Sequence, residues 1–424
     1  MQWFLVFFYS VIFCFCISKI KIIRKSDVKI QWWIAIFLTK VLVGIIYGNI
    51  HSQSYGGGDT LYGFKQGIRV YHTLFDYGIF TYLKLVFFPC HYPIYSGLEK
   101  WANNSIPYGD ESYYLIIRFH ALVALISGSY YNVHVVFYNI LSFSGVFLIY
   151  SAFKDELKEK KYLLIVALIL IPSIVFWTSG IHKDGLALLG IAMIYYSVKN
   201  TSEFSKSNLF ILVFGTLILY IVRSYLIAIL IPILFVYMVF KKAERRLILY
   251  YLFGFTGFAL IIILISSLMS AISPLDKLIW WQSAFNNLPS TENSVAVPVL
   301  LPNLISLVKI IPVSFYHAFL NPLPWQAINI YQLIIGLQDL LLFIVLVFLI
   351  LYTIFKRRQF PHLFYLSIGY TMSLYILLGI IVPNLGALSR YKSTGTFFLC
   401  LAIISLIPIE SVRKIYKYYN KKYI

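Results

Sequence analysis

Charged residues are scarce in this chain. Asp, Glu, Lys and Arg make up 12% of its 424 residues, whereas 60% are hydrophobic and 18% are aromatic. An ordinary soluble domain carries about 25% charged residues, and no polar run here is long enough for a separate soluble domain of roughly 100 residues. The composition therefore excludes a soluble globular protein. It predicts an all-α fold in which residues 1–424 form a single polytopic membrane domain.

Cysteine and the common catalytic motifs are also nearly missing. The four cysteines are Cys14, Cys16, Cys90 and Cys400, and their positions give neither a disulfide framework nor a zinc spacing. The sequence has no GxxxxGK[ST] loop, no HExxH, no GxSxG elbow and no dinucleotide fingerprint after a strand. We therefore expect no nucleotide or redox cofactor and no metal centre, while a divalent cation stays open.

Acidic residues are fewer than basic ones, 16 against 35, which gives a formal net charge of +19. In a soluble protein this excess would suggest nucleic acid as a partner. Here the bases cluster between apolar runs, so we expect them to mark cytoplasmic loops and to contact anionic lipid head groups, with no nucleic acid involved. The clusters are 19–29, 154–161, 241–246, 356–358 and 413–422.

Long apolar runs alternate with these clusters and predict about eleven transmembrane helices, with the N-terminus outside. Residues 113–128 and 300–320 do not fit this alternation, and we expect them to be external juxtamembrane helices. Alternatively, residues 79–93 also cross and pair with 113–128 as a hairpin. The predicted spans are 2–18, 30–50, 132–153, 161–178, 184–198, 207–221, 224–240, 247–271, 329–355, 361–381 and 393–409.

Ionisable residues on the predicted outer side run against the orientation rule. With this topology the outer side holds an external loop at 51–111, another at 272–300, and several short turns. A Lys or Arg at a helix end can simply place its charge among lipid phosphates. The joint occurrence of such residues on one side favours an external cavity that binds an anion. They are Asp59, Lys65, Arg69, Lys183, Asp184, Arg223, Arg390 and Lys392.

Glycine and tryptophan usage on the outer side allows two interpretations each. Gly56, Gly57 and Gly58 directly precede Asp59, where they form either a flexible turn or a close-approach nest of backbone amides for an anion. The tryptophans suit an aromatic belt at the membrane interface or a platform on which sugars stack. They are Trp280, Trp281 and Trp325.

Two segments resemble a known class of enzymes. They are "GGGDTLY" at 56–62 and "LSRYKSTGTFFLCLAIISL" at 388–406. The order of features resembles multispanning glycosyltransferases of the C superfamily and the related O-antigen or capsule repeat-unit polymerases. A third segment, "PSIVFWTSGIHKDGLALLGIAMIYY" at 172–196, resembles a segment of uncharacterised bacterial membrane proteins associated with surface-polysaccharide loci. The chain departs from that pattern in lacking an Asp-Glu or Glu-Asp pair in the first external loop.

The resemblance implies a polyprenyl-diphosphate-linked sugar as substrate, in a multi-pass protein of the bacterial inner membrane. Basic residues would bind the diphosphate and its sugar, and a carboxylate would accept the proton of the attacking hydroxyl. Asp59 is the first candidate for that base and Asp184 the second. The candidates for substrate binding are Lys65, Arg69, Lys183, Arg223, Arg390 and Lys392.

Two other classes of function stay open. A transporter or flippase of lipid-linked oligosaccharide would carry charges through the middle of the membrane. A non-catalytic assembly subunit would tolerate replacement of the external charges. The sequence does not name the sugar, the acceptor or the oligomeric state.

Overall fold

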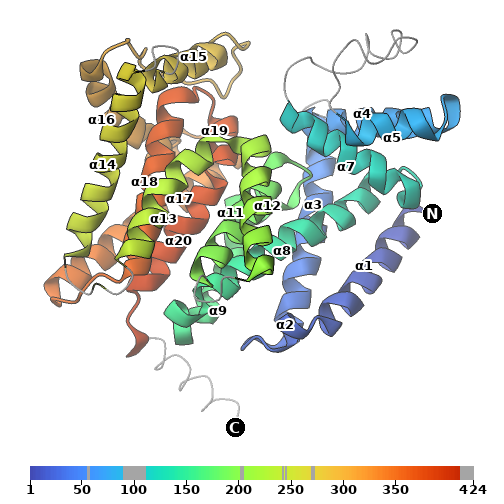
Figure 1. The fold of residues 1–424 in the computed structure, drawn as a ribbon, viewed down its shortest axis with the longest axis horizontal. Helices are drawn as coiled ribbons and strands as arrows, with labels where there is room; N and C mark the ends of the chain where they lie inside the picture. The colour runs from blue at the N-terminus through green and yellow to red at the C-terminus, as the bar shows by residue number, and fades with distance from the viewer. Residues whose placement is uncertain are drawn as a thin grey trace. The chain divides into compact units, whose positions relative to one another are not determined.

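The chain is mostly helical in the part that the computed structural model describes, which is residues 1–54, 58–88, 111–200, 205–240, 243, 246–268 and 273–410 (Figure 1). Besides helices, these residues form one isolated β-bridge, between Ser294 and Asn384. The predicted all-α class is therefore confirmed for the described residues. By contacts the chain divides into two units: Met1–Ser151, Val175–Ser197 and Ser202–Ser224 form unit 1, and the remaining residues form unit 2.

Unit 1 contains the first helices of the chain together with three later ones, two of them in part. They are α1 (Gln2–Lys19), α2 (Lys21–Arg24), α3 (Ile30–Ser54), α4 (Gly58–Asp76), α5 (Ile79–Phe87), α7 (Glu111–Ser127), most of α8 (Tyr131–Leu157), most of α10 (Pro172–Ser179), most of α11 (Lys183–Lys199), and α12 (Lys206–Arg223).

Unit 2 contains two short 3₁₀ turns and the other helices. They are η2 (Lys158–Lys160), α9 (Lys161–Leu170), the start of α10 (Pro172–Ser179), α13 (Tyr225–Val239), α14 (Leu247–Leu268), α15 (Pro274–Asn286), α16 (Leu304–Leu320), η3 (Pro324–Gln326), α17 (Ile330–Phe355), α18 (His362–Ile381), α19 (Leu385–Tyr391) and α20 (Ser393–Leu406).

Six helical stretches in the described residues are long and apolar enough to cross a membrane: Gln2–Lys19, Ile30–Gln53, Tyr131–Leu170, Lys206–Arg223, Ile330–Phe355 and His362–Ile381. The stretch Tyr131–Leu170 joins α8, η2 and α9. The other predicted spans are also helical over most of their described length, among them 247–271, where the 22-residue α14 runs from Leu247 to Leu268. The count of eleven spans, their orientation and the juxtamembrane placement of α7 and α16 stay predictions. The predicted basic clusters at 241–246 and 413–422 lie largely outside the described residues.

The predicted span 161–178 is not one continuous helix. It is divided into α9 and α10 at Ile171, whose backbone is extended, with φ −76° and ψ 110°. Pro172 explains the break, because proline lacks an N–H and its ring disfavours the helical conformation of the residue before it. Proline suits the first position of α10, where the N–H would have no partner within the helix.

The segment predicted as the external loop 51–111 is mostly helical where it is described. In unit 1, α4 and α5 pack on α7 as a three-helix layer (Figure 1). A hydrophobic cluster holds the layer together, formed by Val70, Tyr82, Leu85, Val86, Ile117 and Ala121. Helix α5 has nine residues, which is about 13 Å and too short to cross a membrane. The rest of the alternative crossing segment, 89–93, lies outside the described residues.

The contact between α4 and α7 depends on small residues. The buried face of α4 carries Thr60, Gly63, Gly67 and Thr73 beside Gln66 and Val70. A Cβ atom on Gly67 would lie 2.3 Å from His120 Cβ and 2.8 Å from Ile117 O, closer than any real contact. Glycine at this position therefore lets the two backbones approach, as small residues do between membrane helices.

We expect Gly67→Ala to destabilise the protein by about 1–3 kcal/mol, because the added methyl group must displace the α7 backbone. The matched control is Gly257→Ala in α14, where an added Cβ would meet nothing within 4 Å. That control should be neutral or stabilising by up to about 1 kcal/mol, because alanine favours the helix. Unfolding in mixed detergent micelles measures both changes. Equal effects of the two variants would contradict the packing described for α4 and α7.

Candidate active site

Two helices of unit 1 begin side by side, and each has an aspartate at its second position. Asp59 follows Gly58 in α4, and Asp184 follows Lys183 in α11. The Thr60 hydroxyl donates a 2.9 Å hydrogen bond to Ile181 O, which ties the start of α4 to the turn before α11. A carboxylate in the first turn is stabilised by the positive end of the helix dipole.

Gly58 has a conformational rather than a packing role. Its φ is +49°, in the left-handed region, yet the nearest atom to an added Cβ would be His51 Cδ2 at 3.6 Å, an ordinary contact. Glycine adopts this conformation without strain. Gly56 and Gly57, the other two glycines of the predicted amide nest, lie outside the described residues.

His182 lies between the two aspartates. Its Nε2 is 3.4 Å from Asp59 Oδ2, and its Nδ1 is 3.4 Å from Asp184 Oδ2. The backbone N–H of Lys183 donates to Nδ1 at 2.8 Å, so Nδ1 acts as the acceptor. In a neutral imidazole the proton then sits on Nε2 and points toward Asp59. His182 thus orients the Asp59 carboxylate.

Exposure separates the two aspartates. The side chain of Asp59 is 42% exposed and that of Asp184 is 2% exposed. Asp184 Oδ1 accepts a 2.6 Å hydrogen bond from Nη2 of Arg223, which ends α12 and is 8% exposed. This is a buried, charge-assisted pair between the start of one helix and the end of another. Asp59 is accessible to a ligand, whereas Asp184 and Arg223 join α11 to α12.

The turn between α10 and α11 is held by side chains that bind its carbonyl oxygens. Ser142 donates to Thr178 O at 2.6 Å and Asn139 Nδ2 donates to Ser179 O at 2.9 Å. The Tyr138 hydroxyl donates to His182 O. Buried backbone carbonyls need such partners, and together these bonds fix the position of His182.

Lys183 adds a positive charge beside this arrangement. Its Nζ lies 3.8 Å from the centre of the Tyr113 ring of α7, a cation–π contact, and the side chain is partly exposed. Unit 1 therefore brings together four of the predicted site residues, from three helices: Asp59, Lys183, Asp184 and Arg223. We call these residues with His182 the Asp59 site.

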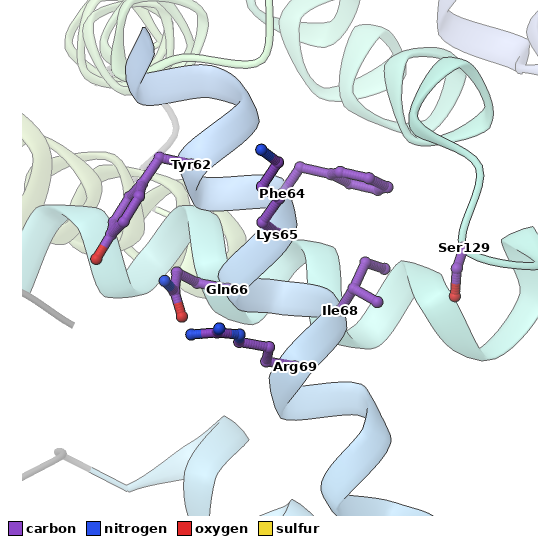
Figure 2. Close-up of a pocket in the computed structure, with 7 residues that line it drawn as sticks. All are labelled: Tyr62, Phe64, Lys65, Gln66, Ile68, Arg69 and Ser129. Atoms are coloured by element: carbon purple, nitrogen blue, oxygen red, sulfur yellow. The ribbon is translucent and has the colours of Figure 1, made fainter. Parts of the chain in front are cut away.

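Lys65 and Arg69 line a pocket of about 490 Å³ on α4. Figure 2 shows Tyr62, Gln66 and Arg69 projecting from one side of the helix, with Ile68 and Ser129 toward the other. Gln66 is buried, and its Oε1 has no hydrogen-bond partner among the described residues. Lys65 lies six residues after Asp59, about 9 Å along the helix axis. Helix α4 therefore carries both Asp59 and the two bases of the pocket, Lys65 and Arg69.

Arg390 and Lys392 belong to unit 2. Lys392 is 1% exposed, and its Nζ donates to Asp339 Oδ2 at 2.5 Å and to Ala318 O at 3.0 Å. Arg390 is partly exposed, and its Nη2 lies 3.0 Å from the Tyr391 hydroxyl. A buried carboxylate thus engages Lys392, as Asp184 engages Arg223. This geometry favours a structural role for Lys392 and Arg223. The predicted binding of substrate by these two bases stays a prediction.

Three relevant residues were not among the predicted site residues. His182 directly precedes Lys183 and Asp184 in the segment 172–196, but its role depends on tertiary contacts that the sequence does not show. Lys40 and Asp339 each stand inside a long apolar helix and are buried. Both could have been found in the sequence as ionisable residues inside long apolar runs, because charged groups are costly within the membrane and need a reason to be there. Lys40 Nζ donates to Thr178 Oγ1 at 2.8 Å and to Ser179 Oγ at 3.2 Å.

Comparisons of the chain with protein families, with curated proteins and with solved structures find no match. Among the described residues, no group of three or more His, Cys, Asp and Glu side chains is placed to hold a metal ion. The function must therefore be argued from the geometry of the site itself.

Proposed function

We propose that this chain is a multi-pass glycosyltransferase or polymerase of the bacterial inner membrane. It transfers sugar from a polyprenyl-diphosphate-linked donor on the external face and contributes to a surface polysaccharide such as O-antigen or capsule. Six long apolar helices support the membrane setting. The observation that carries the chemistry is Asp59, an accessible carboxylate oriented by a buried histidine.

Asp59 suits the role of general base. An accessible carboxylate can reach a hydroxyl of an incoming sugar and accept its proton. In the proposed step, Asp59 takes the proton of that hydroxyl. At the same time the hydroxyl oxygen of the incoming sugar bonds to the anomeric carbon of the donor. The bond from the anomeric carbon to the diphosphate oxygen breaks, and the electron pair leaves with the diphosphate. No nucleotide is needed, because the lipid carries the activated sugar.

The surroundings of Asp59 suit an anionic leaving group. The start of α4 and the start of α11 each present the positive end of a helix dipole. Lys183 adds a full charge that is held in place by the Tyr113 ring. A cation placed where negative charge develops lowers the barrier of the reaction. Lys65 and Arg69 in the α4 pocket extend this positive surface along the same helix.

The role of Lys183 in diphosphate binding can be measured directly. We expect Lys183→Ala to weaken binding of the polyprenyl-diphosphate-linked donor by about tenfold, because one charge-assisted contact is lost. Lys183→Arg should retain most of the affinity, since charge and ring contact remain. Lys84→Ala on α5, which removes an exposed lysine, serves as the control and should bind normally. Equal affinity in Lys183→Ala and Lys84→Ala would remove Lys183 from the binding site.

A transporter of lipid-linked oligosaccharide is the second candidate. One observation favours it: Lys40 is buried within the long apolar helix α3 and is bound to two hydroxyl groups. Buried ionisable groups within spans often mark substrate or proton pathways. The two functions differ in their product, since a transporter moves the donor intact and a transferase cleaves it.

A further inference from the structure

Helix α5 of unit 1 is apolar on two sides, and only one of them packs inside the protein. The inner side carries three members of the hydrophobic cluster that holds the layer together: Tyr82, Leu85 and Val86. The Tyr82 hydroxyl donates to Ala121 O at 3.1 Å, and Arg118 Nη2 donates to Phe88 O at 2.6 Å, at the end of α5. Helix α5 is therefore fixed on α7 by packing and by two hydrogen bonds.

The second side of α5 is exposed. Phe80 is 80% exposed and Phe87 is 63% exposed. Side chains spaced three and four residues apart share one side of a helix, and the exposed apolar residues of α5 have this spacing: Ile79, Phe80, Leu83 and Phe87. Lys84, also exposed, stands at the edge of this side. So much exposed apolar surface on nine residues indicates surroundings other than water.

Helix α7, on which α5 is mounted, is tied to the first long apolar helix of the chain. The Tyr9 hydroxyl of α1 donates a 2.7 Å hydrogen bond to Ile126 O, one residue before α7 ends. Tyr9 comes seven residues after Gln2, the start of α1, which is about 10 Å along the helix axis. Since α1 is long and apolar enough to cross a membrane, the end of α7 lies beside this span rather than beyond it. Interfacial helices insert about 5–10 Å below the head groups, which is the same depth.

An exposed apolar surface continues from α1 along α7 to α5. The end of α7 exposes three apolar residues: Leu122, Leu125 and Ile126. The two hydrogen bonds between α5 and α7 make these helices antiparallel, so the start of α5 lies nearer the end of α7. Helix α4, by contrast, exposes a polar row with helical spacing: Lys65, Arg69, His72 and Asp76. The three-helix layer therefore has an apolar side and a polar side.

We propose that the exposed apolar residues of α5 and of the end of α7, which we call the α5 wedge, lie in bilayer phospholipid. The wedge occupies the leaflet that the start of α1 enters, with α5 along the membrane surface and its outer side among the acyl chains. Lys84 extends from the edge of the wedge to lipid phosphates, and Tyr77, 51% exposed, lies at the level of the head groups. The proposal rests on the membrane setting of the proposed function and not on its reaction.

Spin labels on single cysteines test the depth of the wedge in the full-length protein, reconstituted in phosphatidylglycerol-containing nanodiscs with the four native cysteines replaced by alanine. Labels at Phe80→Cys and Phe87→Cys should collide readily with oxygen, which concentrates among acyl chains. Their collision rate with the water-soluble nickel complex NiEDDA should be at least about fivefold lower than that of the control His72→Cys on the polar row. Phe7→Cys on α1, 69% exposed, reports the span itself and should resemble Phe80→Cys.

Three results would overturn the wedge. Nickel access at Phe80 and Phe87 equal to that at His72 would place the face in water. Low access to both oxygen and nickel would show that protein covers the face. High nickel access at Phe7 would overturn the membrane setting and the wedge with it. No readout depends on sugar transfer, so failure of the proposed reaction and failure of the wedge are told apart.

A second measurement keeps the native cysteines, in case the cysteine-free chain does not accumulate. The photoreactive residue p-benzoylphenylalanine replaces Phe80 with a larger ring on an exposed site, and the same replacement at His72 is the control. After irradiation in the same nanodiscs, mass spectrometry should find the mass of one phospholipid added at position 80 and none at position 72. A cross-link from position 80 to another part of the chain would contradict the wedge.

Discussion

Asp184→Asn should destabilise the protein by about 3–5 kcal/mol, because it leaves the Arg223 charge buried without its carboxylate. The two side chains are 2% and 8% exposed and are joined by a 2.6 Å hydrogen bond. The double variant Asp184→Leu/Arg223→Met should recover much of this loss, since no uncompensated charge remains. The free energy of unfolding in mixed detergent micelles, measured for both singles and the double, gives the coupling between the two residues.

A surface ion pair provides the control for this prediction. Arg358 and Glu410 are 41% and 69% exposed, and their charged atoms are 3.6 Å apart. Arg358→Met should cost no more than about 1 kcal/mol, because water and salt screen exposed pairs. A small effect in Asp184→Asn, equal to that of Arg358→Met, would contradict a buried ion pair between α11 and α12.

Asp59→Asn should lower turnover by roughly 100- to 10,000-fold, the range expected when a general base is lost. The amide keeps the size of the carboxylate but cannot accept the proton. Binding of the lipid-linked donor should stay nearly unchanged, and the protein should remain stable, because Asp59 is 42% exposed. Turnover and donor binding measured on the same preparation separate the roles.

Two outcomes would assign Asp59 differently. Loss of donor binding together with activity would indicate a binding role, for example through a divalent cation. Wild-type turnover would remove Asp59 from the reaction.

Gly58→Asn and Gly58→Val form an independent pair: asparagine tolerates the left-handed conformation seen at φ +49°, whereas valine does not. Only the valine variant should lose activity.

The long apolar helices could be predicted from the sequence, because a run of about 20 apolar residues has few alternatives to a helix. Helices α1, α3, α17 and α18 agree with the predicted spans to within a few residues. The break between α9 and α10 was not predicted, although Pro172 was a visible signal for it.

Helix α4 shows where the hydrophobic pattern gives no guidance. Its buried face consists of threonine, glycine and glutamine rather than aliphatic residues, so the segment was interpreted as part of an external loop. Glycine normally indicates a turn, but in this helix Gly63 and Gly67 permit close contact with α7. That contact depends on residues more than 40 positions away, which local propensity does not include.

Individual site residues could be proposed from the sequence, but their pairing could not. Asp184 and Arg223 are 39 positions apart, and Lys392 and Asp339 are 53 apart. The sequence suggested phosphate-binding bases, and the fold places a carboxylate against Arg223 and another against Lys392. Packing also decides which of the two nearby acids is accessible. It leaves Asp59 exposed and buries Asp184.

The most direct test of the proposed transfer follows the fate of the donor. Purified protein is reconstituted in sealed proteoliposomes with a polyprenyl-diphosphate-linked sugar that is labelled on the sugar, together with an acceptor saccharide. We predict that free polyprenyl diphosphate appears in a one-to-one ratio with sugar transferred to the acceptor, and that Asp59→Asn abolishes both. Movement of intact donor between the leaflets, with no diphosphate released by the wild type, would contradict a transferase and identify a transporter.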